Sequence, residues 1–373
     1  MFQLHLSENL IRLRRDRKIT QEELADFIGV TKAAVSKWEN AQTTPDILLL
    51  PRLASFFDVT IDRLLGYEAQ LSREQIRRCY MELCQDFTNL PFSEVWEKVR
   101  STAHRYYSCY PLLLQLCVLY LNHFMLAETK EDSQEMLKDA LRLCGRILEG
   151  CRDTGICADA AVVKAMLHLQ LGVPSEAIEL LEPTADVNHL SLQSNAGALL
   201  IQAHLMSGNT EKARDYAQVR HYLHLLDLVS DAIQLLLTNA EDFKRCRETM
   251  RRTQGIIDLC QLEHLHPNLA SQYYYQAAVT YAGNEDAAHA LEMLQRFEHC
   301  VNSLLSQERI ALHGDDYFDR LEQWMEQLPL GDGAPRDKAF VRQNAAGALS
   351  HPAFSKLKET PEFRSLYKRL SED

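Results

Sequence analysis

Residues 20–40 of the chain read TQEELADFIGVTKAAVSKWEN, and this stretch carries the start and stop signals of two short helices. Thr20 can cap the free N–H groups of the first helix, and two glutamates follow in its first turn, where the helix dipole favours acids. Gly29 permits the left-handed conformation that ends a helix, and Thr31 can cap the next one. The stretch therefore predicts two helices joined by a tight turn.

The second of these helices has two distinct faces. Helical spacing places Ala34, Val35 and Trp38 on the side that packs inward. The opposite side carries Lys32, Ala33, Ser36 and Lys37. Small and cationic side chains suit base edges and phosphates, so this face predicts a helix that enters the major groove of DNA.

The same residues resemble the XRE/Cro/C1-type helix-turn-helix family. The motifs that carry the resemblance are Gln21 to Ala25, Gly29-Val30, Val35-Ser36 and Trp38-Glu39-Asn40. The resemblance extends over residues 5–66 and implies a five-helix DNA-binding domain. We place that domain at residues 1–66, followed by a linker at 67–72. The chain departs from many relatives at Trp38, where a smaller aliphatic is common, and at Asn40, where glycine is frequent.

The resemblance implies roles for individual residues. Gln21 and Asn40 correspond to phosphate contacts. The DNA-binding set on the second helix comprises the capping residue Thr31 and the base-reading residues Lys32, Ala33, Ser36 and Lys37. Lysine can donate to the O6 and N7 acceptors of guanine, and a good base contact contributes about 1–3 kcal/mol of discrimination.

Charge is distributed unevenly along the chain. Residues 1–66 contain nine Lys/Arg and nine Asp/Glu, whereas the remaining residues contain 31 and 43, so the formal net charge of −12 lies entirely in the latter. Phosphate contacts supply most nonspecific affinity, so one neutral domain would bind DNA weakly. We therefore expect a homodimer that reads a palindromic double-stranded operator, with half-sites about one helical turn, or a multiple of it, apart.

Composition favours a cytoplasmic protein. No apolar stretch is long enough to span a membrane, and the N-terminus lacks the basic-then-apolar order of a signal peptide. The ten cysteines include no C-x-x-C pair and lie mostly in apolar helical runs, which is typical of reduced, buried thiols. A redox sensor built on Cys144, Cys151 and Cys157 is the alternative.

Beyond residue 66 the apolar spacing is helical, and a glycine-to-alanine spacing recurs. Gly172, Gly208 and Gly283 each precede an alanine by five residues. Residues 158–183 are the most regular and resemble a tetratricopeptide repeat, which implies stacked helix pairs whose first helices line a concave face. The chain is thus predicted to be all-α, with a superhelical repeat array at residues 73–373.

Helix boundaries follow from the same periodicity. Four helices are predicted upstream of the regular unit, at residues 73–88, 93–108, 111–128 and 133–150. A degenerate repeat that turns near Asn239 would add helices at residues 218–237 and 241–262. Further helices are predicted at residues 285–306, 314–327, 338–350 and 353–370.

An XRE-type domain joined to such an array resembles the RRNPP family of peptide-responsive regulators. The resemblance implies that a signalling peptide, or a protein partner, binds the concave face. An extended peptide needs side-chain amides to pair with its backbone, and tyrosine offers apolar area with a polar tip. The candidate ligand-binding residues are Asn122, Asn195, Gln202, Tyr274 and Gln276. Ordinary helix packing or solvent exposure is the alternative for each of them.

Catalytic, cofactor and metal sites are not indicated. The sequence contains no P-loop, nucleophile elbow, H-E-x-x-H or dinucleotide fingerprint. His221 with His224, and His264 with His266, are expected to be packing or surface residues, because no clear further ligand accompanies them. Two other functions stay open: a scaffold in which the helix-turn-helix is a docking module, and a repressor that needs no ligand.

Overall fold

The computed structural model describes residues 5–67, 70–185, 196–329, 331, 333 and 336–371. The structure is all-α, as predicted, and the single strand-like pairing among these residues is an isolated bridge between Ala311 and Gly333. Contacts divide the chain into an N-terminal unit, Met1–Leu180, and a C-terminal unit, Leu181–Asp373.

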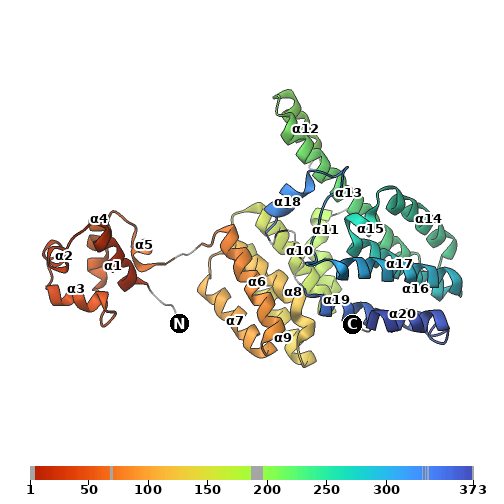
Figure 1. Cartoon of the computed structure of the whole chain (residues 1–373), viewed down its shortest axis with the longest axis horizontal. Helices are drawn as coiled ribbons and strands as arrows, with labels where there is room; N and C mark the ends of the chain where they lie inside the picture. The colour runs from red at the N-terminus through yellow and green to blue at the C-terminus, as the bar shows by residue number, and fades with distance from the viewer. Residues whose placement is uncertain are drawn as a thin grey trace. The chain divides into compact units, whose positions relative to one another are not determined.

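The first residues of the N-terminal unit form a domain of five short helices with a core of its own (Figure 1). The helices are α1 (Leu6–Asp16), α2 (Gln21–Ile28), α3 (Lys32–Glu39), α4 (Leu50–Phe57) and α5 (Ile61–Leu65), with a 3-10 turn, η1 (Ile47–Leu49), before α4. Leu10, Leu24, Ile28, Val35 and Leu53 have no exposed surface. The five-helix arrangement implied by the resemblance is therefore confirmed.

The predicted cap and stop residues of this domain are in place. Thr20 and Glu23 form a reciprocal capping box at the start of α2, and Gly29 ends α2 with a φ of 80°. The side chain of Thr31 then accepts the first free N–H of α3, from Ala34 at 3.2 Å. The tight turn is thus built by residues whose preferred conformations match their positions.

The rest of the N-terminal unit is a bundle of longer helices. They are α6 (Arg73–Asn89), α7 (Phe92–Arg105), α8 (Tyr110–His123), α9 (Lys130–Gly150) and α10 (Thr154–Gln170), with a 3-10 turn, η2 (Phe124–Leu126), after α8. The next helix, α11 (Pro174–Ala185), includes the boundary between the two units. The first four agree with the predicted helices, except that the third ends earlier and tightens into η2. Helix α8 is apolar on most of its surface because α6, α7, α9 and α10 all pack against it.

The C-terminal unit contains nine described α-helices. They are α12 (Ala196–Met206), α13 (Thr210–Thr238), α14 (Phe243–Leu259), α15 (Leu262–Leu265), α16 (Pro267–Gly283), α17 (Ala287–Ser306), α18 (Leu321–Gln327), α19 (Lys338–Ala348) and α20 (Pro361–Ser371). Helices α16 and α17 form the most extensive helix pair, and α19 and α20 both pack against α17 (Figure 1). The core is continuous from α13 to α20.

The recurring glycine-to-alanine spacing marks a turn between helices at Gly172 and Gly208, but the third turn lies two residues after Gly283. Gly172 and Gly208 both have a φ of 75°, and the alanine five residues after each is buried. In the third turn Gly283 is still helical, and Glu285 takes the left-handed conformation with a φ of 62°. The buried alanine is then Ala290, again five residues on. The spacing is therefore preserved, while the prediction that Gly283 forms the turn is wrong.

Helix α13 is longer than predicted. The periodicity predicts a helix from residue 218, whereas α13 runs unbroken from Thr210 to Thr238. No glycine or proline lies in this segment, so nothing interrupts the hydrogen-bond ladder. The predicted turn at Asn239 is confirmed, since Asn239 is the residue that follows the last turn of α13.

Two predicted helices are shorter than expected. The helix predicted at residues 314–327 begins only at Leu321, because the Asp315 carboxylate takes the N–H groups of Tyr317 and Phe318 in a local turn. The helix predicted at 353–370 is divided into a 3-10 turn, η4 (Pro352–Phe354), and α20. Proline at the first position of α20 sets a new start there.

Candidate nucleic-acid interface

Helix α3 presents the predicted outward face to solvent. Lys32, Ala33 and Lys37 are exposed, and Ser36 is half-buried. On the inward side Val35 has no exposed surface and Trp38 is buried. The face that can meet a DNA groove is therefore small, cationic and unobstructed within the domain.

A buried carboxylate ties the three N-terminal helices together. Arg14 of α1 donates from Nε to Glu39 Oε1 at 2.5 Å and from Nη2 to Oε2 at 2.9 Å, and Gln21 of α2 donates to the same Oε2 at 2.9 Å. Burial alone would raise the pKa of Glu39, but the hydrogen bonds from Arg14 and Gln21 and the charge of Arg14 outweigh it, so the pKa is lowered. The network fixes the orientation of α3 relative to α1 and α2.

Sequence reasoning did not identify Arg14 or Glu39 as a pair. The available signal was an acidic residue at position 39, directly after the inward-facing Trp38, where a buried charge requires a partner. Arg14 and Glu39 thus position α3 and lie outside the set expected to contact DNA, whereas Gln21, an expected phosphate contact, donates to Glu39 in this structure.

The remaining predicted DNA contacts surround α3. Asn40 is exposed, and its amide donates to the Ser36 carbonyl at 2.9 Å, which satisfies the end of the helix. Lys32 forms an ion pair with Glu22 at 3.2 Å, and both side chains are largely exposed. Such exposed pairs contribute about 0–1 kcal/mol, so a phosphate or a base can replace Glu22 as the partner of Lys32.

The predicted ligand-binding residues are dispersed. Asn122 lies in the N-terminal unit and donates to the hydroxyl of Tyr80 at 3.0 Å. In the C-terminal unit Gln202 is exposed on α12, and Gln276 is half-buried on α16. Asn195 lies outside the described residues.

Tyr274 cannot contribute groove surface, which corrects the expectation for it. The side chain is fully buried, and its hydroxyl donates to Glu263 at 2.5 Å while accepting from Arg296 and Gln254, each at 3.0 Å. Burial, followed by the Glu263 contact, raises the pKa of Tyr274 above its usual range. The residue links α14, α15, α16 and α17 as part of the core.

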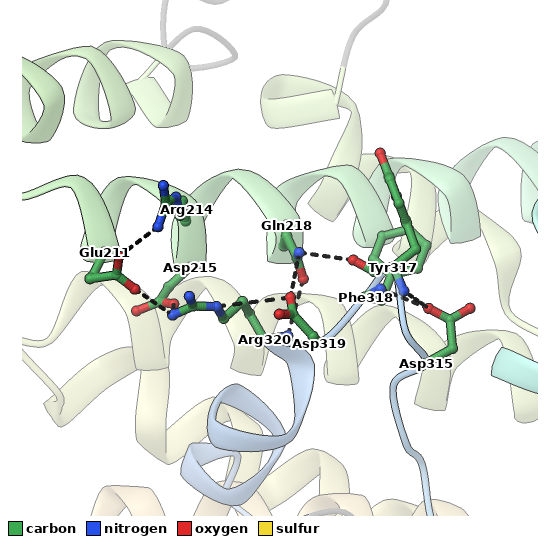
Figure 2. Close-up of polar contacts among 9 residues, drawn as sticks. All are labelled: Glu211, Arg214, Asp215, Gln218, Asp315, Tyr317, Phe318, Asp319 and Arg320. Carbon is green, nitrogen blue, oxygen red and sulfur yellow. Dashed lines mark hydrogen bonds and ion pairs between the residues drawn. The ribbon is translucent and has the colours of Figure 1, made fainter.

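A turn of the chain itself is held on α13 by a side-chain amide (Figure 2). Gln218 donates to the Tyr317 carbonyl at 2.9 Å and accepts from the Arg320 N–H at 3.1 Å, so both amide atoms pair with backbone. Phe318 is buried against the rings of His221 and Tyr222. A side-chain amide therefore pairs with backbone inside this unit, at a residue that sequence reasoning did not select, but that backbone is a turn and not an extended segment.

The cysteines and histidines do not form reactive or metal-binding groups in the described part of the chain. All ten cysteines are free, and Cys144 is fully buried. Desolvation and the neighbouring Cys151 and Asp153 raise the pKa of Cys157, which disfavours the reactive thiolate. His221 packs on Phe318, and no group of three His, Cys, Asp or Glu side chains suited to a metal lies among these residues.

No helix in the ranges that the structure describes is a candidate for crossing a membrane. None of the helices there is both long enough and apolar enough to cross a bilayer.

Comparisons with known proteins concern mainly the N-terminal domain. Residues 10–64 match the family model described as helix-turn-helix. The chain is 40% identical over 65 residues to the HTH-type transcriptional activator BcrR of Enterococcus faecalis, which covers 17% of this chain and 32% of BcrR. It is 36% identical over 63 residues to the uncharacterized HTH-type transcriptional regulator YqaE of Bacillus subtilis (strain 168), which covers 17% of this chain and 54% of YqaE. The chain thus spans about a third to a half of these relatives.

Two solved structures overlay much of the chain at low similarity. The crystal structure of Bacillus thuringiensis PlcR in complex with the peptide PapR7 and DNA covers 81% of this chain and 96% of that one, at 15% identity and a TM-score of 0.32. The apo form of the competence regulator ComR from Streptococcus vestibularis covers 87% and 97%, at 12% identity and a TM-score of 0.25.

Proposed function

We propose that the protein is a sequence-specific DNA-binding transcription regulator. The observation that carries the proposal is the exposed, cationic face of α3, with Lys32, Ala33 and Lys37 outward on a helix oriented by the buried Glu39. Its placement in a domain that matches the helix-turn-helix family over residues 10–64 supports the same function. Lys32 and Lys37 would donate to guanine, while Gln21, Thr31, Ser36 and Asn40 complete the contact set.

In this proposal residues 1–66 form the DNA-binding domain. A linker at residues 67–72 joins it to residues 73–373, which dimerise and sense a ligand. A homodimer follows from charge, since residues 1–66 are neutral overall and the rest of the chain carries the net charge of −12. One neutral domain makes too few phosphate contacts for tight binding, and a second copy doubles their number. The cytoplasm is the compartment in which such a dimer would meet its operator.

The sensed ligand is proposed to be a short peptide or a protein partner. Support comes from Gln218, whose side-chain amide pairs with the backbone of residues 317 and 320 in a turn, because a side-chain amide would pair with the backbone of a separate peptide by the same chemistry. A ligand that prefers one relative placement of the two DNA-binding domains would change operator affinity by a coupling of about 1–3 kcal/mol.

The test is a selection of bound fragments from a random DNA library by the purified full chain, followed by sequencing. The proposal predicts an enriched palindrome, whose repeat distance gives the half-site spacing. Absence of enrichment at low salt would contradict it and favour the scaffold function instead.

A further inference from the structure

A groove of about 980 Å³ opens between α14, the C-terminal half of α16 and the first turns of α17. Tyr281 and Met293 give it apolar surface, while Met250 and Tyr273 line it but are buried in the core. Ligand pockets in proteins are typically about 300–1,000 Å³, so this groove can hold a segment of a few residues. All of it belongs to the C-terminal unit.

One wall of the groove is cationic. Helix α14 lines it with Lys244, Arg245, Arg247 and Arg251, although the chain beyond residue 66 has an excess of acidic residues. Three of these cations lie in the first turns of α14, where the helix dipole is already positive. Cations at that end do not favour the helix, so their positive potential is left to attract an anion from outside.

Acidic residues of the groove neutralise only part of this charge. The Asp242 carboxylate lies 3.8 Å from Nε of Arg245, and the Glu248 carboxylate is shared by Arg251 at 2.9 Å and by Arg252 at 2.8 Å. Hydrogen bonds from these two arginines lower the pKa of Glu248 to about 2, so that carboxylate stays ionised and occupied.

Two cations of the wall keep their donors available. Within the described ranges neither Lys244 nor Arg247 makes an ion pair shorter than 4 Å. Across the groove, α17 contributes His289, which contacts Asp286 at 2.8 Å, and the acid Glu292. The groove therefore offers two cations on one wall and one carboxylate on the other.

We propose that this groove binds a short acidic peptide, with Lys244 and Arg247 pairing with its carboxylates and the apolar surface receiving a neighbouring apolar side chain. The inference rests on the proposed sensing function and names the chemical class of its ligand. Glu292 would accept a peptide N–H or pair with an amino terminus, whereas it would repel a ligand that is anionic along its whole length. A nucleic acid fits poorly for that reason, and because the net charge of −12 repels a long polyanion.

The test exposes the full chain to a bead library of random seven-residue peptides at low salt, and the retained peptides are sequenced. Enrichment of Asp and Glu beside apolar residues is expected. A retained peptide, resynthesised with a fluorescent label, should bind about tenfold more weakly to Lys244→Gln and to Arg247→Gln, since one charge-assisted hydrogen bond contributes about that factor. Arg364→Gln is the matched control, because Arg364 is an exposed arginine of the same unit that does not line the groove and donates to the Lys358 carbonyl.

Several results would overturn the inference. They are retention of no peptide, enrichment of peptides without acids, equal affinities for Arg247→Gln and Arg364→Gln, and displacement of the labelled peptide by a short single-stranded oligonucleotide. The DNA selection on the same preparation separates the two proposals. An enriched operator without an acidic peptide removes only the groove, whereas an acidic peptide without an operator removes only the DNA-binding function.

Discussion

The N-terminal domain and the C-terminal unit hold their helices together in different ways. The short helices of the domain are joined by a carboxylate that is buried with its arginine: the Arg14 and Glu39 side chains are 15% and 5% exposed. The corresponding pair of the C-terminal unit, Arg369 with Glu298, has its arginine 52% exposed and lies at the edge of a large apolar core. Helices of about two turns bury little apolar surface, so polar links have more weight where helices are short.

The largest expected effect is a difference in DNA affinity between variants of the N-terminal domain and variants of the C-terminal unit. Replacing Lys32 and Lys37 together by alanine should weaken specific binding by about 100-fold or more, because each good base contact contributes about 1–3 kcal/mol. Anisotropy titration with the selected operator measures the change. The double variant Lys244→Ala with Arg247→Ala is the control and should bind DNA as the unchanged protein does. A similar loss in both would show that charge, and not the α3 face, determines binding.

The next prediction compares the two arginine–carboxylate pairs directly. Arg14→Met should destabilise the N-terminal domain by about 3 kcal/mol, since it leaves Glu39 buried without its cation. Arg369→Met should lower the stability of the C-terminal unit by about 1 kcal/mol. The Arg369 side chain is half-exposed, so water can reach Glu298 once it is removed. Residue-resolved hydrogen exchange measures each loss in its own region. Equal costs would contradict the distinction drawn between the regions.

Low pH should lower the stability of the N-terminal domain through the carboxylate of Glu39. The folded state lowers the pKa of Glu39, so its contribution to stability is complete above the unfolded-state pKa and is lost as pH falls through the folded-state pKa. Urea unfolding of the domain from pH 6 to pH 3 should show a decline that is smaller in Glu39→Gln. An identical decline in both proteins would assign the acid sensitivity to other groups.

A smaller effect distinguishes the two turns of the C-terminal unit. Gly208→Ala should cost about 1 kcal/mol, although a Cβ there meets no atom within 4 Å, because the residue has a φ of 75°. Glu285→Gly should change stability in the opposite direction, by less than about 1 kcal/mol, since it relieves a left-handed glutamate and removes only an exposed ion pair with Lys356. Thermal unfolding of both variants tests this, and a loss of stability in Glu285→Gly would refute the assigned turn.

The smallest effect concerns a buried hydroxyl beside the segment held on α13. Tyr222 Oη has no hydrogen-bond partner among the described residues, and burial raises the pKa of Tyr222 to about 12. Tyr222→Phe keeps the ring contacts with Phe318 and Trp324 and should raise stability by up to about 1 kcal/mol. A loss of that size in thermal unfolding would reveal a bond that the hydroxyl makes.

Local signals were sufficient to predict α2, α3 and the turn between them, whereas the five-helix domain was implied by the family resemblance. Thr20, Gly29 and Thr31 act within a few residues of their own position, so the sequence contains everything needed to place α2 and α3. The outward face of α3 follows from helical spacing for the same reason. What escaped was the Arg14–Glu39 link, because its two residues are 25 positions apart and no periodic pattern connects them.

Long-range contacts explain the errors in the C-terminal unit. Residues 314–320 have helical spacing, yet Gln218 and the Asp315 carboxylate hold residues 315–320 in a turn that is not helical. Glu285 was overlooked because glycine two residues earlier is the stronger turn signal. The expectation of groove surface at Tyr274 was wrong because sequence alone does not show which tyrosine of a run of three faces the core.

The most direct test of base reading by α3 is a paired selection from the random DNA library with the unchanged protein and with Ala33→Asn. Asparagine can pair with adenine through two hydrogen bonds, so the preferred base is predicted to shift to adenine at one position of each half-site, with the spacing unchanged. An identical enriched sequence for both proteins, or none for either, would contradict the claim that this face of α3 reads DNA.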